Sequence, residues 1–216
     1  MKNFLSQTEV RGETALKLGI VDPYRMHQWI WNTLPYDPNM KRDFLFRSDV
    51  SNDVVRILLL SERIPCDSHG AEWLTTELSP TFLGHGAYRF RLRANPTQRC
   101  KAYDLERDEG KHRRFALLAK EEIRNWFLRK FTNAGCEIRA IDNNGNDVLD
   151  FEMTSPKRIR FGLTKGSRKS GTFYSVDASG TLLVRDEAAF RAAFDAGIGP
   201  AKGFGFGLLL LQPVQL

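Results

Sequence analysis

The chain has 216 residues and a mass of 24.7 kDa, enough for one large domain or two small domains of about 100 residues each. Its 15 phenylalanines and 42% hydrophobic residues can fill packed cores, which excludes a disordered chain. A formal net charge of +6 with a pI near 9.3 favours a polyanionic partner.

The cysteines are scattered, with no CxxC pair and no histidine at zinc-ligand spacing, so we expect neither a structural metal nor a disulfide framework. The first seven residues lack the apolar core of a signal peptide. No apolar run approaches the roughly 18 residues that a membrane helix needs. We therefore expect a soluble, cytoplasmic protein without membrane contact.

The first half of the chain alternates strands and helices. Residues 3–10 predict a strand, and Asp22 followed by Pro23 predicts the start of a helix over 24–34. The remaining expected elements are two strands, a short helix and a strand with strict apolar and basic alternation, at 44–47, 56–60, 71–78 and 88–95.

The second half repeats this order, with an additional hairpin. Its expected helices cover 121–131 and the segment from the cap Asp186 to about Ala196. Its expected strands lie at 114–118, 138–141, around Phe151, and at 159–163, 172–176, 181–184 and 207–213. The sequence thus predicts an α+β chain of two tandem ferredoxin-like (βαββαβ) domains, 1–95 and 114–216, joined by a basic linker over 96–113.

Five glycines lie between Gly197 and Gly207, directly before an apolar strand. The segment follows a helix and opens a strand, which excludes a dinucleotide-binding turn, and Lys202 is not followed by Ser or Thr, which excludes a P-loop. We therefore expect no cofactor. A glycine-rich turn required for close packing is one interpretation, and a loop that brings Lys202 near RNA is another.

Basic residues concentrate in two regions. Three arginines alternate along the strand over 88–95, and a neighbouring aliphatic strand could not pair all of them. Around 107–114 a solvated charged face is an equal alternative. The residues that we predict to bind RNA are Arg89, Arg91, Arg93, Lys101, Lys111, Arg113, Arg114, Lys157, Arg158, Arg160, Lys165, Arg168, Lys169 and Lys202. The hairpin over 157–169 could track the phosphates of an A-form helix or enter its groove edge-on.

Tyr24 and His27 are three residues apart on the first expected helix, so they share one face. A histidine in the first turns of a helix feels the positive end of the dipole, which favours a neutral imidazole that can accept a proton. RNA supplies its own nucleophile, the 2′-hydroxyl, and such a reaction needs no metal. Simple packing on an aromatic-rich helix is the alternative.

Four segments resemble the CasE family, the CRISPR RNA-processing endoribonucleases of type I-E Cascade complexes. They are residues 22–31 (DPYRMHQWIW), 42–47 (RDFLFR), 88–96 (YRFRLRANP), and 197–202 (GIGPAK) with 205–209 (GFGLL). The resemblance implies two ferredoxin-like domains of the RNA-recognition type. It also implies metal-independent cleavage of the repeat precursor at the base of its hairpin, leaving a 5′-hydroxyl and a 2′,3′-cyclic phosphate.

The resemblance places His27 on the catalytic histidine of the family and Tyr24 on its companion tyrosine. It implies that the product hairpin stays bound and that the other Cascade subunits are partners. The identity of a third catalytic residue, a cation, is left open between Lys41 and Lys202. Two rival interpretations remain at this stage: a non-catalytic RNA hairpin-binding subunit of a ribonucleoprotein complex, and a scaffold subunit whose basic surfaces meet acidic proteins.

Overall fold

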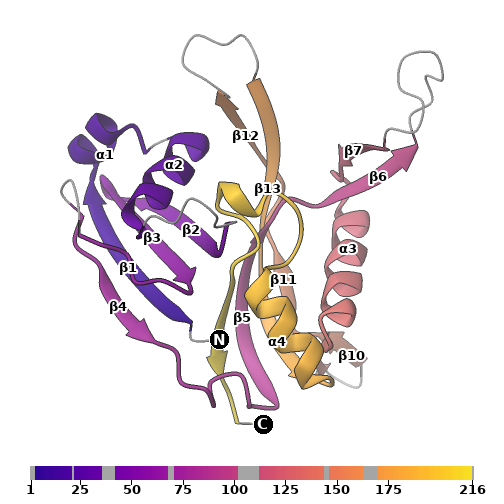
Figure 1. Cartoon of the computed structure of the whole chain (residues 1–216). Helices are drawn as coiled ribbons and strands as arrows, with labels where there is room; N and C mark the ends of the chain where they lie inside the picture. Colours follow the sequence, from indigo (N-terminus) through magenta and orange to yellow (C-terminus); the bar gives the residue numbers. More distant parts are fainter. Residues whose placement is uncertain are drawn as a thin grey trace.

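Two antiparallel sheets lie side by side, each with its helices on one face (Figure 1). The computed structural model describes residues 3–20, 22–35, 42–67, 71–101, 112–143, 146–162 and 170–215. Within these residues the chain has the tandem ferredoxin-like architecture expected from the sequence.

The N-terminal sheet has the strand order β2-β3-β1-β4, which is the order of a ferredoxin-like fold. Its elements are β1 (Phe4–Arg11), α1 (Gly12–Leu18), α2 (Pro23–Thr33), β2 (Phe44–Ser51), β3 (Val54–Ser61) and β4 (Leu74–Glu77). The cap of α2 forms as predicted, because Oδ1 of Asp22 accepts hydrogen bonds from the backbone N–H groups of Tyr24 (2.9 Å) and Arg25 (3.1 Å).

The C-terminal sheet has the order β11-β13-β5-β14, the same ferredoxin-like order, and β8 and β12 also pair with β13. Its elements are β5 (Ala87–Ala94), α3 (Lys120–Asn133), β8 (Cys136–Ile138), β11 (Phe151–Met153), β13 (Ser170–Val184), α4 (Glu187–Ala196), the short helix η1 (Lys202–Phe204) and β14 (Leu209–Pro213). The cap of α4 is Asp186, which accepts from the N–H of Ala189.

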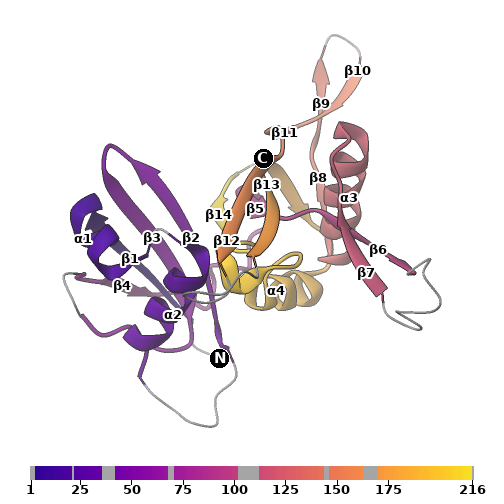
Figure 2. The same ribbon diagram turned by 90° about the horizontal axis from the view of Figure 1, so that it is seen from above.

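Three hairpins extend from this second domain (Figures 1 and 2). They are formed by β6 (Thr97–Lys101) with β7 (His112–Ala116), β9 (Ala140–Asn143) with β10 (Asn146–Leu149), and β12 (Lys157–Gly162) with the first part of β13. The β12–β13 pair is the hairpin that the sequence predicted. The others were not recognised as hairpins.

The predicted domain boundary at residue 95 is wrong. The strand over 88–95 is β5, and it pairs with β13 and β14 at the centre of the second sheet. Its apolar residues Tyr88, Phe90 and Leu92 are buried in the C-terminal core. The segment over 114–118 is not the first strand of that domain, because its residues in β7 pair with β6, and the expected linker over 96–113 therefore carries part of an inserted hairpin.

Two expected elements differ in kind. The helix expected over 71–78 is instead β4, where Thr75 and Thr76 pair with the free edge of β1, because β-branched residues and an open sheet edge outweigh a weak helical pattern. The strands expected at 172–176 and 181–184 are one continuous strand, β13. Gly180 between them does not end the strand: a Cβ there would collide with the backbone carbonyl of Asp150, so glycine allows a close approach of β13 to the residue preceding β11.

The two domains share apolar contacts. Leu45 of β2 and Leu60 of β3 pack with the C-terminal core, while the opposite face of this sheet packs against α2 through Phe46, Ile57 and Leu59. The glycine-rich segment before β14 reaches the N-terminal domain, since η1 contacts both α2 and β2. The helix α2 and the glycine-rich segment before β14 therefore meet at the domain junction.

Candidate active site

His27 lies on α2 at the domain junction and is half-buried among aromatic rings. Its imidazole stacks on Phe44 of β2, with ring centroids 5.4 Å apart, and is 6.1 Å from the ring of Trp31. From the second domain, the ring of Phe204 in η1 lies 6.5 Å away. The imidazole is thus held from both domains.

The glycine-rich loop closes over this histidine. A Cβ at Gly203 would lie 3.6 Å from Nδ1 of His27 and 3.2 Å from Nη1 of Arg42. A side chain at position 203 would therefore crowd the site, and glycine lets the loop backbone come close to both groups. The loop therefore connects the last helix to the last strand and also forms one wall of the site around His27.

The electrostatics of His27 favour the neutral imidazole. Burial is the larger cause of the lowered pKa of His27, and the positive charge of Arg42 lowers this pKa further. The direction agrees with the sequence prediction, and burial and the charge of Arg42 are causes that the sequence did not indicate. Within the described part of the chain, Nδ1 of His27 is buried without a hydrogen-bond partner, an unusual state for a core histidine.

Tyr24 lies one turn before His27 on α2, so the two residues share a helix face as predicted. Its side chain is half-buried. The helix therefore brings together the two residues predicted to be catalytic.

A basic cavity of about 440 Å³ adjoins the same loop. Arg99 of β6, Arg114 of β7, Lys130 of α3 and Lys202 line it, and no carboxylate is among the described residues that do so. Arg99 and Arg114 are direct cross-strand partners, a like-charge arrangement that is unfavourable without an anion. Arg99 and Lys130 were not singled out from the sequence, although both are basic residues of elements that meet at this cavity.

A second basic surface lies on β12, which contacts α2. Lys157, Arg158 and Arg160 are exposed there, and Arg158 and Arg160 share one face of the strand. Lys111, Lys165, Arg168 and Lys169 lie outside the described residues. Lys101 and Arg113 belong to β6 and β7, but their side chains are outside the described part.

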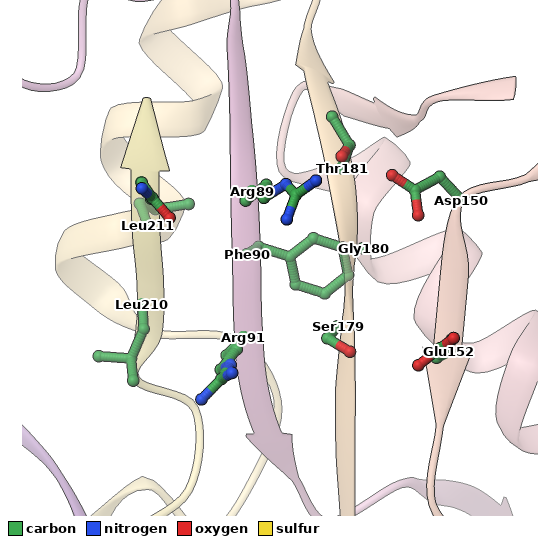
Figure 3. Close-up of a pocket in the computed structure, with 11 residues that line it drawn as sticks. Arg89, Phe90, Arg91, Asp150, Glu152, Ser179, Gly180, Thr181, Leu210 and Leu211 are labelled. Carbon is green, nitrogen blue, oxygen red and sulfur yellow. The ribbon is translucent and has the colours of Figure 1, made fainter. Parts of the chain in front are cut away.

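Arg89 and Arg91 lie on the face of the C-terminal sheet opposite its helices and line a cavity of about 450 Å³ (Figure 3). Asp150 and Glu152 line the same cavity, so this face carries both signs of charge. Its electrostatics are less favourable for an anion than those of the cavity next to Lys202.

Arg93 departs from the expectation of three free arginines on β5. Its Nη2 pairs with Asp49 of β2 at 2.7 Å, its Nε pairs with Asp177 of β13 at 3.1 Å, and its Nη1 donates to the carbonyl of Ser48. Burial lowers the pKa of Arg93, but its carboxylate partners outweigh this effect and raise the pKa. Arg93 is therefore an interdomain ion-pair residue, because the strand beside β5 supplies a carboxylate that the aliphatic pattern did not suggest.

The described residues hold neither a metal-binding cluster nor a membrane-spanning helix. Among them, no group of three or more His, Cys, Asp and Glu side chains is arranged to hold a metal ion. No helix within them is long and apolar enough to cross a membrane.

The fold and the junction define a tandem ferredoxin-like protein with a cation-rich site around one histidine. A family model described as CRISPR associated protein matches residues 4–213. The Cascade subunit CasE of Escherichia coli K12 is 32% identical over 199 residues, which cover 89% of this chain and 93% of CasE. The chain belongs to this CRISPR-associated family, as a CasE-type member.

Solved structures of CRISPR-associated proteins match the fold of this chain. A crystal structure of Cas6e from E. coli K-12 matches with a TM-score of 0.72 and 28% identity, over 98% of this chain and 100% of that one. A structure of Thermus thermophilus Cse3, bound to an RNA representing a pre-cleavage complex, matches in fold with a TM-score of 0.76 and 21% identity, over 99% of this chain and 100% of that one. In sequence, the Cse3 endoribonuclease of T. thermophilus is 30% identical over 128 residues, 58% of this chain and 55% of that protein.

Proposed function

We propose that this chain is an endoribonuclease that cleaves CRISPR repeat precursor RNA at the base of the repeat hairpin and then stays bound to the hairpin as a Cascade subunit. One observation carries the proposal: a half-buried histidine with a lowered pKa and an unpartnered Nδ1 lies among cations where the two domains meet. The names of the relatives, a Cascade subunit and an endoribonuclease, support the same reaction.

The proposed reaction is an internal transesterification that needs no metal. His27 accepts the proton of the 2′-hydroxyl, the 2′-oxygen forms a bond to the adjacent phosphorus, and the bond from phosphorus to the 5′-oxygen breaks. The 5′-oxygen takes up a proton from the imidazolium of His27 or from water, which leaves a 5′-hydroxyl and a 2′,3′-cyclic phosphate. Tyr24 orients the scissile phosphate or shares in the proton transfer.

The two basic surfaces next to the junction suit a structured RNA. The cavity with Arg114 and Lys202 and the exposed strand β12 with Arg158 and Arg160 both adjoin elements that contact α2 or the glycine-rich loop. We assign phosphate contacts to these residues and to Lys157. Arg89 and Arg91 would contact RNA only beside the carboxylates of their mixed face.

The test is cleavage of a labelled repeat hairpin in EDTA by the wild type and by His27→Ala. Loss of the general base should slow cleavage about 10²- to 10⁴-fold, while hairpin affinity stays within a few-fold. The matched control is His85→Ala, which removes an exposed histidine that packs on Tyr88 away from the site. Equal cleavage by wild type and His27→Ala would remove His27 from the mechanism.

The same assay separates the enzyme from a non-catalytic hairpin-binding subunit. Tight binding of the hairpin by the wild type with no cleavage in any buffer would favour that alternative. A 2′-deoxy substitution at the cleavage site should abolish cleavage by the wild type, because the nucleophile is then absent.

A further inference from the structure

Arg42 is a cation beside the proposed catalytic histidine, and the sequence analysis did not single it out. It lies two residues before β2, and its Nη1 and Nδ1 of His27 both border the position that a Cβ of Gly203 would occupy. The loop backbone at Gly203, the guanidinium and the imidazole thus surround one small space at the domain junction.

The position of Arg42 is fixed by its neighbours in sequence. Asp43 forms a two-pronged ion pair with Arg63, with Oδ2 to Nε at 2.7 Å and Oδ1 to Nη2 at 2.6 Å. Both side chains of this pair are largely shielded from solvent. The chain is therefore anchored immediately after Arg42, and β2 begins with Phe44, which stacks on His27.

Among the described residues, no carboxylate balances the charge of Arg42. In the described part of the chain no ion pair of Arg42 is found, and Asp43 is committed to Arg63. The positive charge of Arg42 instead acts on two other basic groups, since it contributes to the lowered pKa of both His27 and Lys202. Basic groups held this close repel one another unless an anion lies between them.

We propose that Arg42 binds the scissile phosphate and is the catalytic cation of this site. Its guanidinium donates hydrogen bonds to the non-bridging oxygens, on which charge accumulates as the 2′-oxygen attacks, while His27 takes the proton. Arg42 neither gains nor loses a proton in the step. This assignment rests on the proposed endoribonuclease function and deepens it.

The structure distinguishes Arg42 from the two lysines considered from the sequence. Lys202 lines the cavity with Arg99, Arg114 and Lys130, and its Cγ packs near Gly207, so it serves a neighbouring phosphate. Lys41 lies outside the described residues. Only Arg42 among the described cations borders the same point as Nδ1 of His27.

The test compares wild type, Arg42→Gln and Arg42→Lys in single-turnover cleavage at saturating protein, with hairpin affinity measured separately. Arg42→Gln should lower the cleavage rate about 10²- to 10³-fold, as loss of one donor to a developing oxyanion does, with affinity changed only a few-fold. Arg42→Lys should recover part of the rate because it keeps the charge but not the two-pronged geometry. The control Arg56→Gln removes an exposed arginine that pairs with Glu9.

A phosphorothioate at the scissile position gives a readout that a structural role would not change. The wild type should cleave one diastereomer more slowly, because sulfur weakens the contact with the guanidinium, and Arg42→Gln should lose this preference. A folded Arg42→Gln variant that keeps the wild-type rate, or the wild-type preference between diastereomers, overturns the assignment. If the wild type itself does not cleave, the proposed function fails instead.

Discussion

At the residue scale, the environment of His27 determines which of its protonation states is present. An exposed histidine would be partly protonated near pH 6.5, but burial and the charge of Arg42 lower the pKa of His27. A general base must be neutral, so this environment favours the form that the proposed role of His27 requires, at a pH where an exposed histidine would be charged. The aromatic rings and the close backbone at Gly203 bury the imidazole, and the charge of Arg42 adds to the effect of burial.

The lowered pKa predicts the pH dependence of cleavage. The rate should rise with pH through the pKa of His27 and level off, with the rising limb below 6.5. Arg42→Gln removes one of the two causes, the positive charge, and leaves burial, so its rising limb should move to higher pH. Single-turnover rates of the wild type and of Arg42→Gln between pH 4.5 and 8 measure the rising limb of each protein. This range surrounds the ordinary histidine pKa of about 6.5. A limb that stays in place in Arg42→Gln would mean that His27 does not sense this charge.

At the element scale, capping residues and alternation located most helices and strands but not their partners. Asp22–Pro23 and Asp186 begin their helices as predicted, since a cap acts through neighbouring backbone N–H groups. β4 was mistaken for a helix because its stability comes from pairing with β1, which is distant in sequence. The position of β5 in the second sheet was missed for the same reason.

The strand β12 carries a prediction of its own. Charge reversal in Arg158→Glu/Arg160→Glu should weaken hairpin affinity strongly and reduce the slope of log K against log salt by about 0.7–0.9 for each phosphate that the variant no longer neutralises. The same reversal at Arg89 and Arg91 is the matched control, because those arginines face carboxylates. Hairpin affinity measured at several salt concentrations tests this prediction. A larger loss of affinity in the Arg89 and Arg91 variant would mean that the RNA binds to the face shown in Figure 3 instead of β12.

At the scale of the whole molecule, the site is formed where α2 of the first domain meets the glycine-rich segment before β14 of the second. That His27 and Tyr24 share a helix face could be predicted from the helix pattern, because their spacing is local; their catalytic roles stay a prediction. Arg42, Gly203 and Phe204 could not be placed beside them, since their proximity depends on the second domain docking on β2 and α2. Arg93 shows the converse: a residue that looks like part of a free basic face is used to join the domains.

The docking depends on an ion-pair network between the domains, which gives the last prediction. Arg47 and Arg93 both contact Asp177, and Asp49 pairs with both arginines, so β2 is tied to β5 and β13. Arg93→Met should lower the free energy of unfolding by about 1–3 kcal/mol, because Asp49 and Asp177 lose charged hydrogen bonds while partly shielded from solvent. The control Arg89→Met, on the same strand face, should change it by less than about 0.5 kcal/mol. Urea denaturation measures the free energy of unfolding of both variants.

Because the guanidinium of Arg93 is fully paired within the protein, Arg93→Met should leave the salt dependence of hairpin binding unchanged. A reduced slope of log K against log salt would mean that Arg93 contacts the RNA.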